Sequence, residues 1–574
     1  AASDVYKRQT INDIFTGSKM LEIPFFQRSY VWKESEWERM LEDIENVCVT
    51  KEPYFMGSVI LKQQLTQSNS TVGDVRTVID GQQRLTTLSI LLKVLCLKTN
   101  ALRKFDKRFR LDDDRPVLQH SFNDVASYNR IMDLQKIEEL PYKDTITSAY
   151  TYFAENLDPF KVDFDVICSK IMFVGIDLNY DENEQQIFDT INSLGVRLTT
   201  AELLKNYFFS RDDLDLYKTH WRDVFERDED TRSYWGQEIV TGRIKRTFID
   251  LFFYSLLQIL VQDSKYAVRA EDKSTFSRVE SLFPSYKKFV GSYLNGDKNS
   301  LLKEMVKYAD VFRNKIDGSV VDKELPKKAG IERINVLIFA LDTTTLIPYI
   351  LFIEQNVQDE QQKNDLYGYL ESYIMRRLVT RQTTKNYNQL FTERLIANRI
   401  MTKSDFIVYL AKQTDKINYM PTNSEVTAAF HTSVLTNKYA AGTIYLLESK
   451  IRNEQMSSTQ LLGIRKYSLE HMMPKKWRNH WKFNGTDEQA TERDRVLLTL
   501  GNLAIITQSL NASIRDSEWS IKLAGKGTKE GLKKYANGIE TISKYLDYTE
   551  WNESCIKERA DELANKAIEV WSCQ

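Results

Sequence analysis

The sequence feature that most constrains this chain is a long helical stretch in its middle, residues 216–454. Few glycines occur there, and apolar residues recur at the spacing of helices that bury one face. The clearest such segments are Phe248–Val261, Leu301–Phe312, Ile334–Leu341 and Leu366–Leu378. The most apolar run, Leu251–Val261, falls well short of the roughly 20 residues that span a bilayer, so we expect a buried helix. Motifs that carry chemistry must therefore be sought on either side of a helical scaffold.

The rest of the sequence divides around this stretch. A length of 574 residues predicts several domains, at about 100–200 residues each. We expect an α+β multidomain protein with an α/β domain at 10–215, the helical middle at 216–454, and a C-terminal domain at 455–574 with a helical tail from about Lys529 onward. Residues 1–9 resemble translated adaptor sequence and are expected to be a non-native leader.

The composition is typical of a globular protein from a reducing compartment. Apolar residues make up 42% and charged residues 28% of the chain, as in ordinary globular domains. The five cysteines are scattered and form no C-x-x-C, which argues against a disulfide framework or a structural zinc. No basic segment followed by an apolar one opens the chain, so we see no sign of secretion. We expect a cytoplasmic protein without a membrane partner.

A candidate nuclease site lies in the C-terminal region. Of the five histidines, His471 is the one directly preceded by a carboxylate, Glu470, in a strand-like segment, Tyr467–Met472, that ends before Pro474. Hydrolysis of a phosphodiester needs a base to activate water and a metal to neutralise the phosphate. A strand end would fix the imidazole, with Glu470 able to reach a cation. The sequence therefore predicts a metal-dependent nuclease site here.

A second strand is predicted downstream of this pair. Gly501-Asn502-Leu503 leads into strand-like Leu503–Thr507, and we expect the strand to end at Leu510-Asn511. Asn502 and Asn511 are nine residues apart. This separation fits one asparagine near the return of a hairpin and one beside the metal.

The charge distribution gives limited support to nucleic-acid binding. The net charge of −1 is unfavourable, because phosphate neutralisation dominates such binding. Two basic clusters occur, one directly after the candidate site and one in the helical middle: Lys475, Lys476, Arg478, His480 and Lys482, and then Arg376, Arg377 and Arg381. Runs of charged residues most often form solvated surface. Only the first cluster is favoured as a DNA contact, because it directly follows the candidate nuclease site.

The N-terminal region contains a strand, a tight polar turn and a helix. Ser58–Leu61 and Val75–Ile79 are predicted to form a hairpin, and the helix Leu85–Leu97 follows the D-G-Q-Q-R turn, Asp80–Arg84. A helix N-terminus offers unpaired N–H groups and a positive dipole end to an anion. Arg84 can add a bidentate phosphate contact, and Asp80 is suited to hold a metal or act on water.

Other residues of this region extend the candidate anion site. Gly81 lets the backbone approach a ligand closely, and Gln27-Arg28 adds a second donor group before an aromatic cluster, in which Tyr30 or Trp32 could offer a stacking surface. A helix is also predicted at Glu184–Leu194, and another from the cap-like Thr199 to Phe209. The alternative is that D-G-Q-Q-R forms no more than a well-capped helix.

The C-terminal motifs resemble the His-Me finger (HNH) superfamily, including the D half of the GmrSD family and the HNH domain of CRISPR effector nucleases. The shared features are E-H-x-x-P, then G-N-L, and an Asn nine residues after the first. A ββα-metal fold is implied, with His471 as general base and Glu470 and Asn511 binding Mg²⁺ or Mn²⁺. Asn502 would tie down the loop, and Trp519 and Lys522 would lie at the DNA backbone. The chain lacks the histidine that many members carry before G-N-L, and Asp516 is a weak further metal candidate.

The alternative for His471 is a histidine beside the core, which is the usual role of a lone histidine. The combined pattern of Glu-His, G-N-L and a later Asn at fixed spacing favours the nuclease interpretation.

The N-terminal motifs resemble the S half of GmrSD, a ParB/sulfiredoxin-like domain. Its later signature corresponds to Ile187–Leu198, followed by Leu204-Lys205-Asn206. The resemblance implies that a nucleoside triphosphate (NTP) is bound and hydrolysed, with Asp80 taking part in hydrolysis. The implied nucleotide contacts are Gln27, Arg28, Asp80, Gly81, Gln82, Gln83 and Arg84. No G-x-x-x-x-G-K-[ST] occurs, so the site would not be of the P-loop type.

Together these motifs predict an NTP-regulated, metal-dependent endonuclease of the modification-dependent restriction type, acting on modified phage DNA in antiphage defence. Two alternatives stay open. One is an NTP-dependent, ParB-like DNA-binding switch without cleavage, and the other is a toxin-like nuclease that acts on unmodified DNA or RNA. The sequence leaves open the DNA modification, the nucleotide, and whether the chain forms a homo-oligomer.

Overall fold

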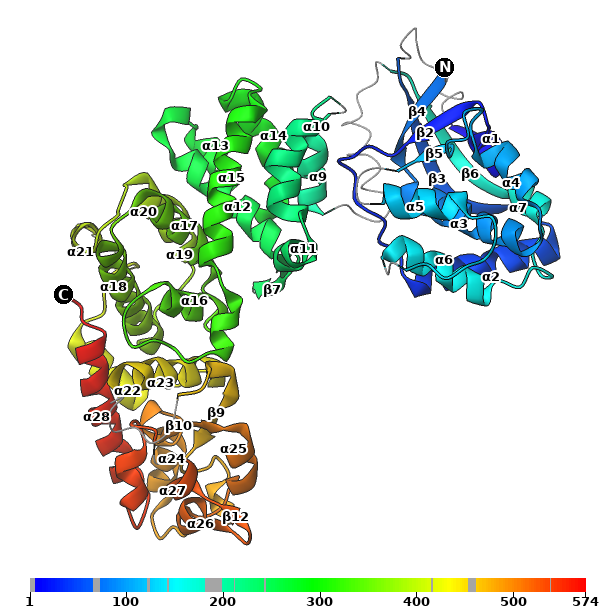
Figure 1. The fold of residues 1–574 in the computed structure, drawn as a ribbon. Helices are drawn as coiled ribbons and strands as arrows, with labels where there is room; N and C mark the ends of the chain where they lie inside the picture. Colours follow the sequence, from blue (N-terminus) through cyan, green and yellow to red (C-terminus); the bar gives the residue numbers. More distant parts are fainter. Residues whose placement is uncertain are drawn as a thin grey trace. The chain divides into compact units, whose positions relative to one another are not determined.

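The computed structural model describes residues 6–65, 73–120, 124–141, 144–180, 199–210, 212–241, 244–413, 417–452, 461–536 and 538–574. The chain forms two compact units, Ala1–Asp223 and Val224–Gln574 (Figure 1). None of the described helices combines the length and the apolar character that a membrane crossing requires.

A mixed β-sheet forms the centre of the N-terminal unit, in the strand order β1-β6-β3-β4-β2-β5. The strands are β1 (Tyr6–Thr10), β2 (Lys19–Glu22), β3 (Tyr54–Gln63), β4 (Asp74–Asp80), β5 (Leu118–Gln119) and β6 (Ile171–Leu178). β3 pairs antiparallel with β4 and in parallel with β6. The α+β character and the predicted strands are confirmed, whereas the ParB/sulfiredoxin-like fold stays a prediction. The loop between β3 and β4 lies largely outside the described residues.

Residues 6–9, which belong to the expected leader, form β1 together with Thr10. They pair antiparallel with β6 and cover one edge of the sheet.

The N-terminal unit also contains helices. They are α1 (Ile11–Ile14), α2 (Glu34–Thr50), α3 (Gln82–Lys98), α4 (Leu102–Phe109), α5 (Val125–Asp133), α6 (Thr145–Asn156), α7 (Phe164–Lys170), α9 (Thr200–Phe208) and α10 (Leu214–Tyr217), followed by the π-helical segment η1 (Lys218–Glu226). From Leu85 to Leu97 every side chain of α3 is buried, as expected for a helix that is apolar all round. The core therefore centres on α3.

Two helix predictions in this unit need comment. α3 begins at Gln82 rather than at Leu85, because Gly81, with φ 97°, serves as the N-cap and Gln82–Arg84 already form the first turn. The capping box predicted at Thr199 is present, with Glu202 as its acidic partner. The helix predicted at Glu184–Leu194 lies outside the described residues.

The C-terminal unit contains the helical middle predicted from the sequence. Its helices up to residue 451 include α11 (Glu229–Trp235), α12 (Phe248–Gln262), α13 (Ala270–Phe276), α14 (Leu282–Tyr293), α15 (Lys298–Lys315), α16 (Ile331–Phe339), α17 (Ile347–Asn356), α18 (Glu360–Val379), α19 (Tyr387–Gln389), α20 (Leu395–Ala397), α21 (Lys403–Ala411), α22 (Asn423–Thr432) and α23 (Asn437–Ile451). α12 is buried, as predicted. A hairpin of β7 (Glu238–Thr241) and β8 (Ile244–Thr247) interrupts the helices, and the sequence analysis did not predict it.

The last part of this unit combines a small hairpin with short helices. Its elements are β9 (Tyr467–His471), α24 (Asp487–Val496), η9 (Leu500–Asn502), β10 (Leu503–Thr507), α25 (Gln508–Ile514), α26 (Trp519–Ala524), β11 (Gly525–Lys526), β12 (Lys529–Glu530), α27 (Leu532–Tyr535) and α28 (Glu553–Val570). The predicted helical tail from Lys529 is wrong in its first part, since β12 begins there. The long tail helix starts only at Glu553.

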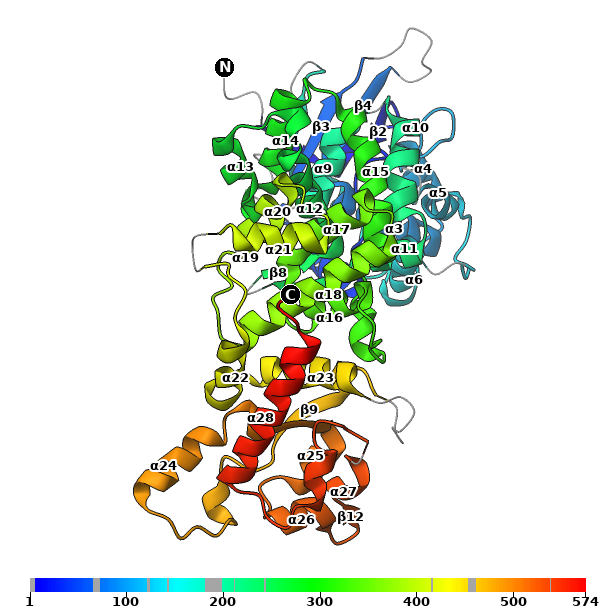
Figure 2. The same ribbon diagram turned by 90° about the vertical axis from the view of Figure 1, so that its left-hand side faces the viewer.

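The helix α28 connects this small hairpin with the helical middle (Figure 2). The guanidinium of Arg559 donates to the carbonyl oxygens of Leu500, Gly501 and Leu503. Just beyond the helix, the indole of Trp571 donates to Glu371 of α18 at 3.1 Å. One helix of 18 residues therefore holds both structures.

Candidate functional sites

Glu470 and His471 lie at the end of a two-stranded hairpin. β9 and β10 pair antiparallel, so that His471 is opposite Leu503 and Glu470 is opposite Ala504. β9 ends at His471, and the N–H of Met472 then donates to the carbonyl of Asn502 at 2.9 Å. The predicted strand pairing is therefore present, and the Glu-His pair lies at the end of the hairpin where residues 472–502 connect the two strands.

Asn502 ties together the beginning and the end of the segment that connects β9 with β10. Its carboxamide oxygen accepts from the N–H of Met473 at 2.8 Å and from the indole of Trp551 at 3.0 Å. Its nitrogen donates to the carbonyls of Met473 and Leu497, both at 2.8 Å. The side chain is fully buried, and these contacts are those of a loop anchor.

Asn511 does not end a strand as the sequence predicted. β10 stops at Thr507, and Asn511 lies on α25, which packs against β9. Its Nδ2 donates to Ser468 Oγ at 2.9 Å and to the carbonyl of Leu469 at 3.1 Å, next to Glu470. The Oδ1 accepts no hydrogen bond within the described part of the chain. The strands β9 and β10 and the helix α25 thus place Asn511 beside β9, the strand that carries Glu470 and His471.

Glu470 is buried and paired with a lysine. Its carboxylate accepts a hydrogen bond from Lys522 of α26, which also donates to the carbonyl of His471 at 2.8 Å. Burial raises the pKa of the Glu470 carboxyl group, and the ammonium of Lys522 opposes that shift. Lys522 is 0% exposed, which argues against its predicted place at the DNA backbone.

His471 is half-buried, and its side chain makes no hydrogen bond among the described residues. Burial, together with the positive charges of Lys475 and Lys522, lowers its pKa to about 4. The imidazole is therefore neutral at neutral pH, which is the form that can accept a proton.

The donor atoms at this hairpin suit a hydrated divalent ion. A carboxylate and a carboxamide oxygen are hard ligands of the type that Mg²⁺ prefers, and Mg²⁺ usually keeps several waters. Within the described ranges, no three His, Cys, Asp or Glu side chains gather as a metal cluster, so Asp516 does not complete one. The residues therefore fit an ion held by Glu470 and Asn511, with water and phosphate as the remaining ligands.

The basic side chains that follow β9 are of two kinds. Lys475, Lys476 and Lys482 are exposed. Arg478 instead makes two hydrogen bonds to Asp494, at 2.9 and 2.8 Å, and lies over the ring of Trp477. The lysines are free of these constraints and are the better candidates for phosphate contacts.

Two arginines of the second basic cluster are structural, whereas Arg381 is exposed as expected. Arg376 and Arg377 are 1% and 0% exposed, which corrects the expectation of a solvated surface. Arg376 donates to Pro421 at 2.8 Å, and Arg377 donates to the carbonyl of Tyr419 at 3.0 Å. These arginines tie α18 to the segment before α22.

The structure brings together three N-terminal motifs: Gln27–Trp32, Tyr54–Ser58 and Asp80–Arg84. The side chain of Gln82 donates to the carbonyl of Arg28 at 2.9 Å, and that of Gln83 bonds the backbone of Ser29 and Val31. Gln27 donates to the carbonyl of Val78 at 2.7 Å. The glutamines of both motifs therefore fix the loop to the start of α3.

Tyr30 is not a stacking surface. It is 4% exposed, and its hydroxyl bonds Thr87 at 2.6 Å and the indole of Trp37 at 2.8 Å. It belongs to the core under the loop.

Arg84 and Asp80 form the charged part of the N-terminal site. They pair at 3.2 Å, and Arg84 also donates to the carbonyl of Met56 at 3.1 Å. Ser58, to which the sequence analysis gave no role, donates to Asp80 at 3.0 Å. The Tyr54–Ser58 motif is therefore part of this site.

The start of α3 can receive an anion. Its first intrahelical bond runs from the N–H of Leu85 to the carbonyl of Gly81, so the N–H groups of Gln82–Arg84 precede it. The Oε1 of Gln82 is buried without a hydrogen-bond partner among the described residues. Arg28 Nη1 lies 3.9 Å from Glu202 Oε1, and the Arg28 side chain is 24% exposed.

We expect Gly57→Ala to disturb Arg84. Gly57 has φ 107°, and an added Cβ would lie 2.1 Å from Arg84 Nη1. The strained backbone alone should cost about 1–3 kcal/mol, measured as the free energy of unfolding in denaturant. Gly73→Ala is the matched control, because an added Cβ there meets no atom within 4 Å. Equal stability of the two variants would contradict the backbone conformation of Gly57 and its close approach to Arg84.

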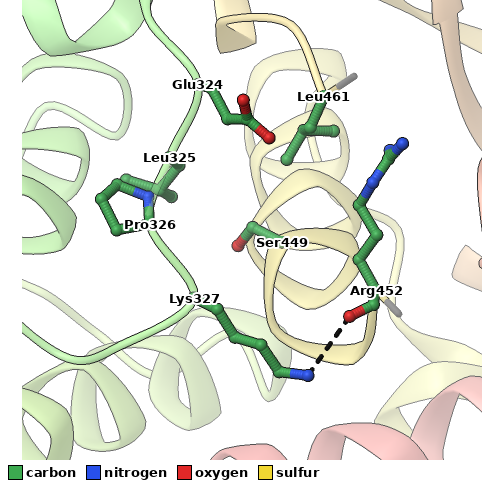
Figure 3. Close-up of a pocket in the computed structure, with 7 residues that line it drawn as sticks. All are labelled: Glu324, Leu325, Pro326, Lys327, Ser449, Arg452 and Leu461. Atoms are coloured by element: carbon green, nitrogen blue, oxygen red, sulfur yellow. Dashed lines mark hydrogen bonds between the residues drawn. The ribbon is translucent and has the colours of Figure 1, made fainter. Parts of the chain in front are cut away.

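A separate cavity of about 430 Å³ lies in the C-terminal unit (Figure 3). It is lined by Glu324, Leu325, Pro326, Lys327, Ser449, Arg452 and Leu461. Lys327 closes one side by donating to the carbonyl of Arg452 at 3.2 Å. None of the predicted site residues lines it.

Two family models match the chain and agree with this division of sites. The GmrSD restriction endonuclease N-terminal domain matches residues 11–209, and the GmrSD C-terminal domain matches residues 420–566. The C-terminal match begins before residue 455 and includes α22 and α23. No curated protein matches the chain. Because the two matches together span more than half of the sequence and occur in the family's order, the chain belongs to the GmrSD family of restriction endonucleases.

Proposed function

We propose that this restriction endonuclease is metal-dependent and NTP-regulated, and that it cuts modified phage DNA in antiphage defence. The observation that carries the proposal is the hairpin that holds Glu470, His471 and Asn511 on adjoining elements, with His471 in its neutral form.

In this proposal His471 accepts a proton from water. The water oxygen forms a bond to phosphorus while the bond to the 3′ oxygen breaks. Glu470 and Asn511 would hold a Mg²⁺ or Mn²⁺ ion, which supplies charge stabilisation at the phosphate. The HNH-type assignment rests on this arrangement of residues.

The N-terminal site would bind and hydrolyse an NTP. Arg84 and the N-terminus of α3 offer donors to phosphate groups, and Asp80 would act in hydrolysis. Asp80 pairs with Arg84 at 3.2 Å, so a bound phosphate would replace or share the carboxylate as the partner of Arg84.

The test is cleavage of unmodified, cytosine-modified and phosphorothioate DNA, each with Mg²⁺ or Mn²⁺ and with or without the common NTPs. We expect cuts in one modified DNA, dependent on the metal and changed by an NTP. Equal cutting of unmodified DNA or RNA would instead support the toxin-like alternative. NTP-dependent DNA binding without strand breaks would support the switch.

Arg84→Ala should weaken nucleotide binding about 10- to 100-fold, the value of a lost charged hydrogen bond, and should abolish NTP turnover. The matched control is Arg76→Ala on β4, whose guanidinium pairs with Asp74 and Asp177. Nucleotide affinity is measured by titration calorimetry. If both variants bound nucleotide as tightly as the unchanged chain does, the assignment of Arg84 as a nucleotide contact would be contradicted.

A further inference from the structure

The lysine that pairs with Glu470 has no part in the reaction as proposed above. Its ammonium bonds two consecutive residues of β9, the carboxylate of Glu470 and the carbonyl of His471. We propose that Lys522 is a positioning residue for the nuclease reaction, which fixes the Glu470 carboxylate and the end of β9 and does not touch DNA. This role rests on the nuclease function proposed for the site.

Burial makes Lys522 necessary for the position of Glu470. The glutamate is 5% exposed, and among the described residues only Lys522 donates a hydrogen bond to its carboxylate. A buried carboxylate without a counter-charge is costly, so the position of the Glu470 carboxylate follows the ammonium of Lys522. The same ammonium holds the His471 backbone at 2.8 Å, and thus couples both members of the pair.

Lys522 is itself held by the network that anchors the hairpin. On α26, Trp519 and Lys522 are both buried, three residues apart on one face. The indole of Trp519 donates to the carbonyl of Tyr548 at 2.8 Å, and its ring lies 5.3 Å from that of Trp551. Trp551 in turn donates to Asn502 at 3.0 Å. The lysine and the hairpin therefore share one rigid support.

The neighbouring lysines differ from Lys522 in the property that matters for DNA. Lys475 and Lys476 are exposed, whereas Lys522 is 0% exposed. A lysine that contacts DNA phosphates has to reach the surface. The two kinds of lysine can therefore be separated by experiment.

The first experiment is acetylation of surface lysines on the unchanged full chain, in EDTA, with and without duplex DNA, read by mass spectrometry. We expect Lys522 to stay unmodified in both conditions. Lys475 and Lys476 should be modified in the free chain and protected by DNA. Modification of Lys522 in the free chain and its protection by DNA would overturn the proposal.

The second experiment compares Lys522→Met with Lys475→Met in the full chain. Lys522→Met should lower the single-turnover cleavage rate at saturating DNA about 10- to 100-fold, and weaken Mn²⁺ binding in the absence of DNA by a similar factor, as expected for the loss of a residue that orients a metal ligand. Mn²⁺ binding is read by electron paramagnetic resonance. DNA affinity in EDTA should not change. Lys475→Met should weaken DNA affinity and reduce its salt slope by about 1, with Mn²⁺ binding retained.

The double variant Glu470→Gln/Lys522→Met controls for folding, because it leaves no unpaired buried charge. Its thermal midpoint should exceed that of Lys522→Met, while Mn²⁺ binding stays weak. Loss of DNA affinity in Lys522→Met, with cleavage rate and Mn²⁺ binding retained, would show a DNA contact and refute the proposal. If the unchanged chain cuts no DNA with any divalent ion, the proposed nuclease function fails. The acetylation pattern and the Mn²⁺ affinity do not depend on cleavage, so they still test whether Lys522 positions Glu470.

Discussion

His471→Ala is expected to lower the single-turnover rate of DNA cleavage about 10²- to 10⁴-fold, the usual contribution of a general base. The effect should be confined to the chemical step, because the imidazole makes no hydrogen bond to other described residues. Thermal stability and DNA affinity in EDTA should therefore change little. The measurement is cleavage of end-labelled DNA with enzyme in excess, in Mg²⁺ and in Mn²⁺.

His431→Ala is the matched control for this prediction. His431 lies on α22 and pairs with Asp561 of α28 at 2.7 Å, remote in sequence from the hairpin. We expect its cleavage rate to equal that of the unchanged chain. A His471→Ala protein that cuts at the unchanged rate would remove the proposed base.

The largest effect on stability is expected from Arg333→Met. Arg333 and Glu371 are each 1% exposed and make two parallel hydrogen bonds, at 2.7 and 2.8 Å. Arg333 also donates to Ser449 at 3.0 Å. Its removal leaves Glu371 buried without its main counter-charge, which should cost about 3–5 kcal/mol of unfolding free energy.

A surface pair of the same chemistry provides the control. Arg465 pairs with Asp322 at 3.0 Å, but its side chain is 64% exposed, so Arg465→Met should cost about 0–1 kcal/mol. Both variants can be compared by denaturant unfolding followed by tryptophan fluorescence. The double variant Arg333→Met/Glu371→Gln should regain part of the loss. Equal effects of Arg333→Met and Arg465→Met would contradict the buried network.

Local pattern was enough to predict the regular elements. β10 has the bounds that its strand-forming residues indicated, and α12 is the buried helix expected from its apolar run. Element ends were less certain. The first turn of α3 consists of polar residues, so periodicity alone placed its start three residues late.

Partners distant in sequence could not be predicted in the same way. Gln82 bonds a carbonyl 54 residues away, and Lys522 bonds a carboxylate 52 residues away. The sequence nevertheless contained a clue to the pairing of Lys522 with a carboxylate. Trp519, Lys522 and Leu523 have the spacing of one helix face, and a lysine on an apolar face signals a buried ion pair. The same reasoning applies to Arg376 and Arg377 within the apolar pattern of α18.

The anchoring of α28 has a consequence for biosynthesis. A chain emerging from the ribosome folds from its N-terminal side, and β9, η9 and β10 are made before Trp551 and Arg559. Until those residues appear, Asn502 lacks its indole donor, and the carbonyls of Leu500–Leu503 lack the Arg559 guanidinium. The hairpin with Glu470 and His471 is thus completed only after the N-terminal part and the helical middle have been synthesised in full. An unfinished chain therefore carries the proposed nucleotide site before it carries the completed hairpin of the proposed nuclease site.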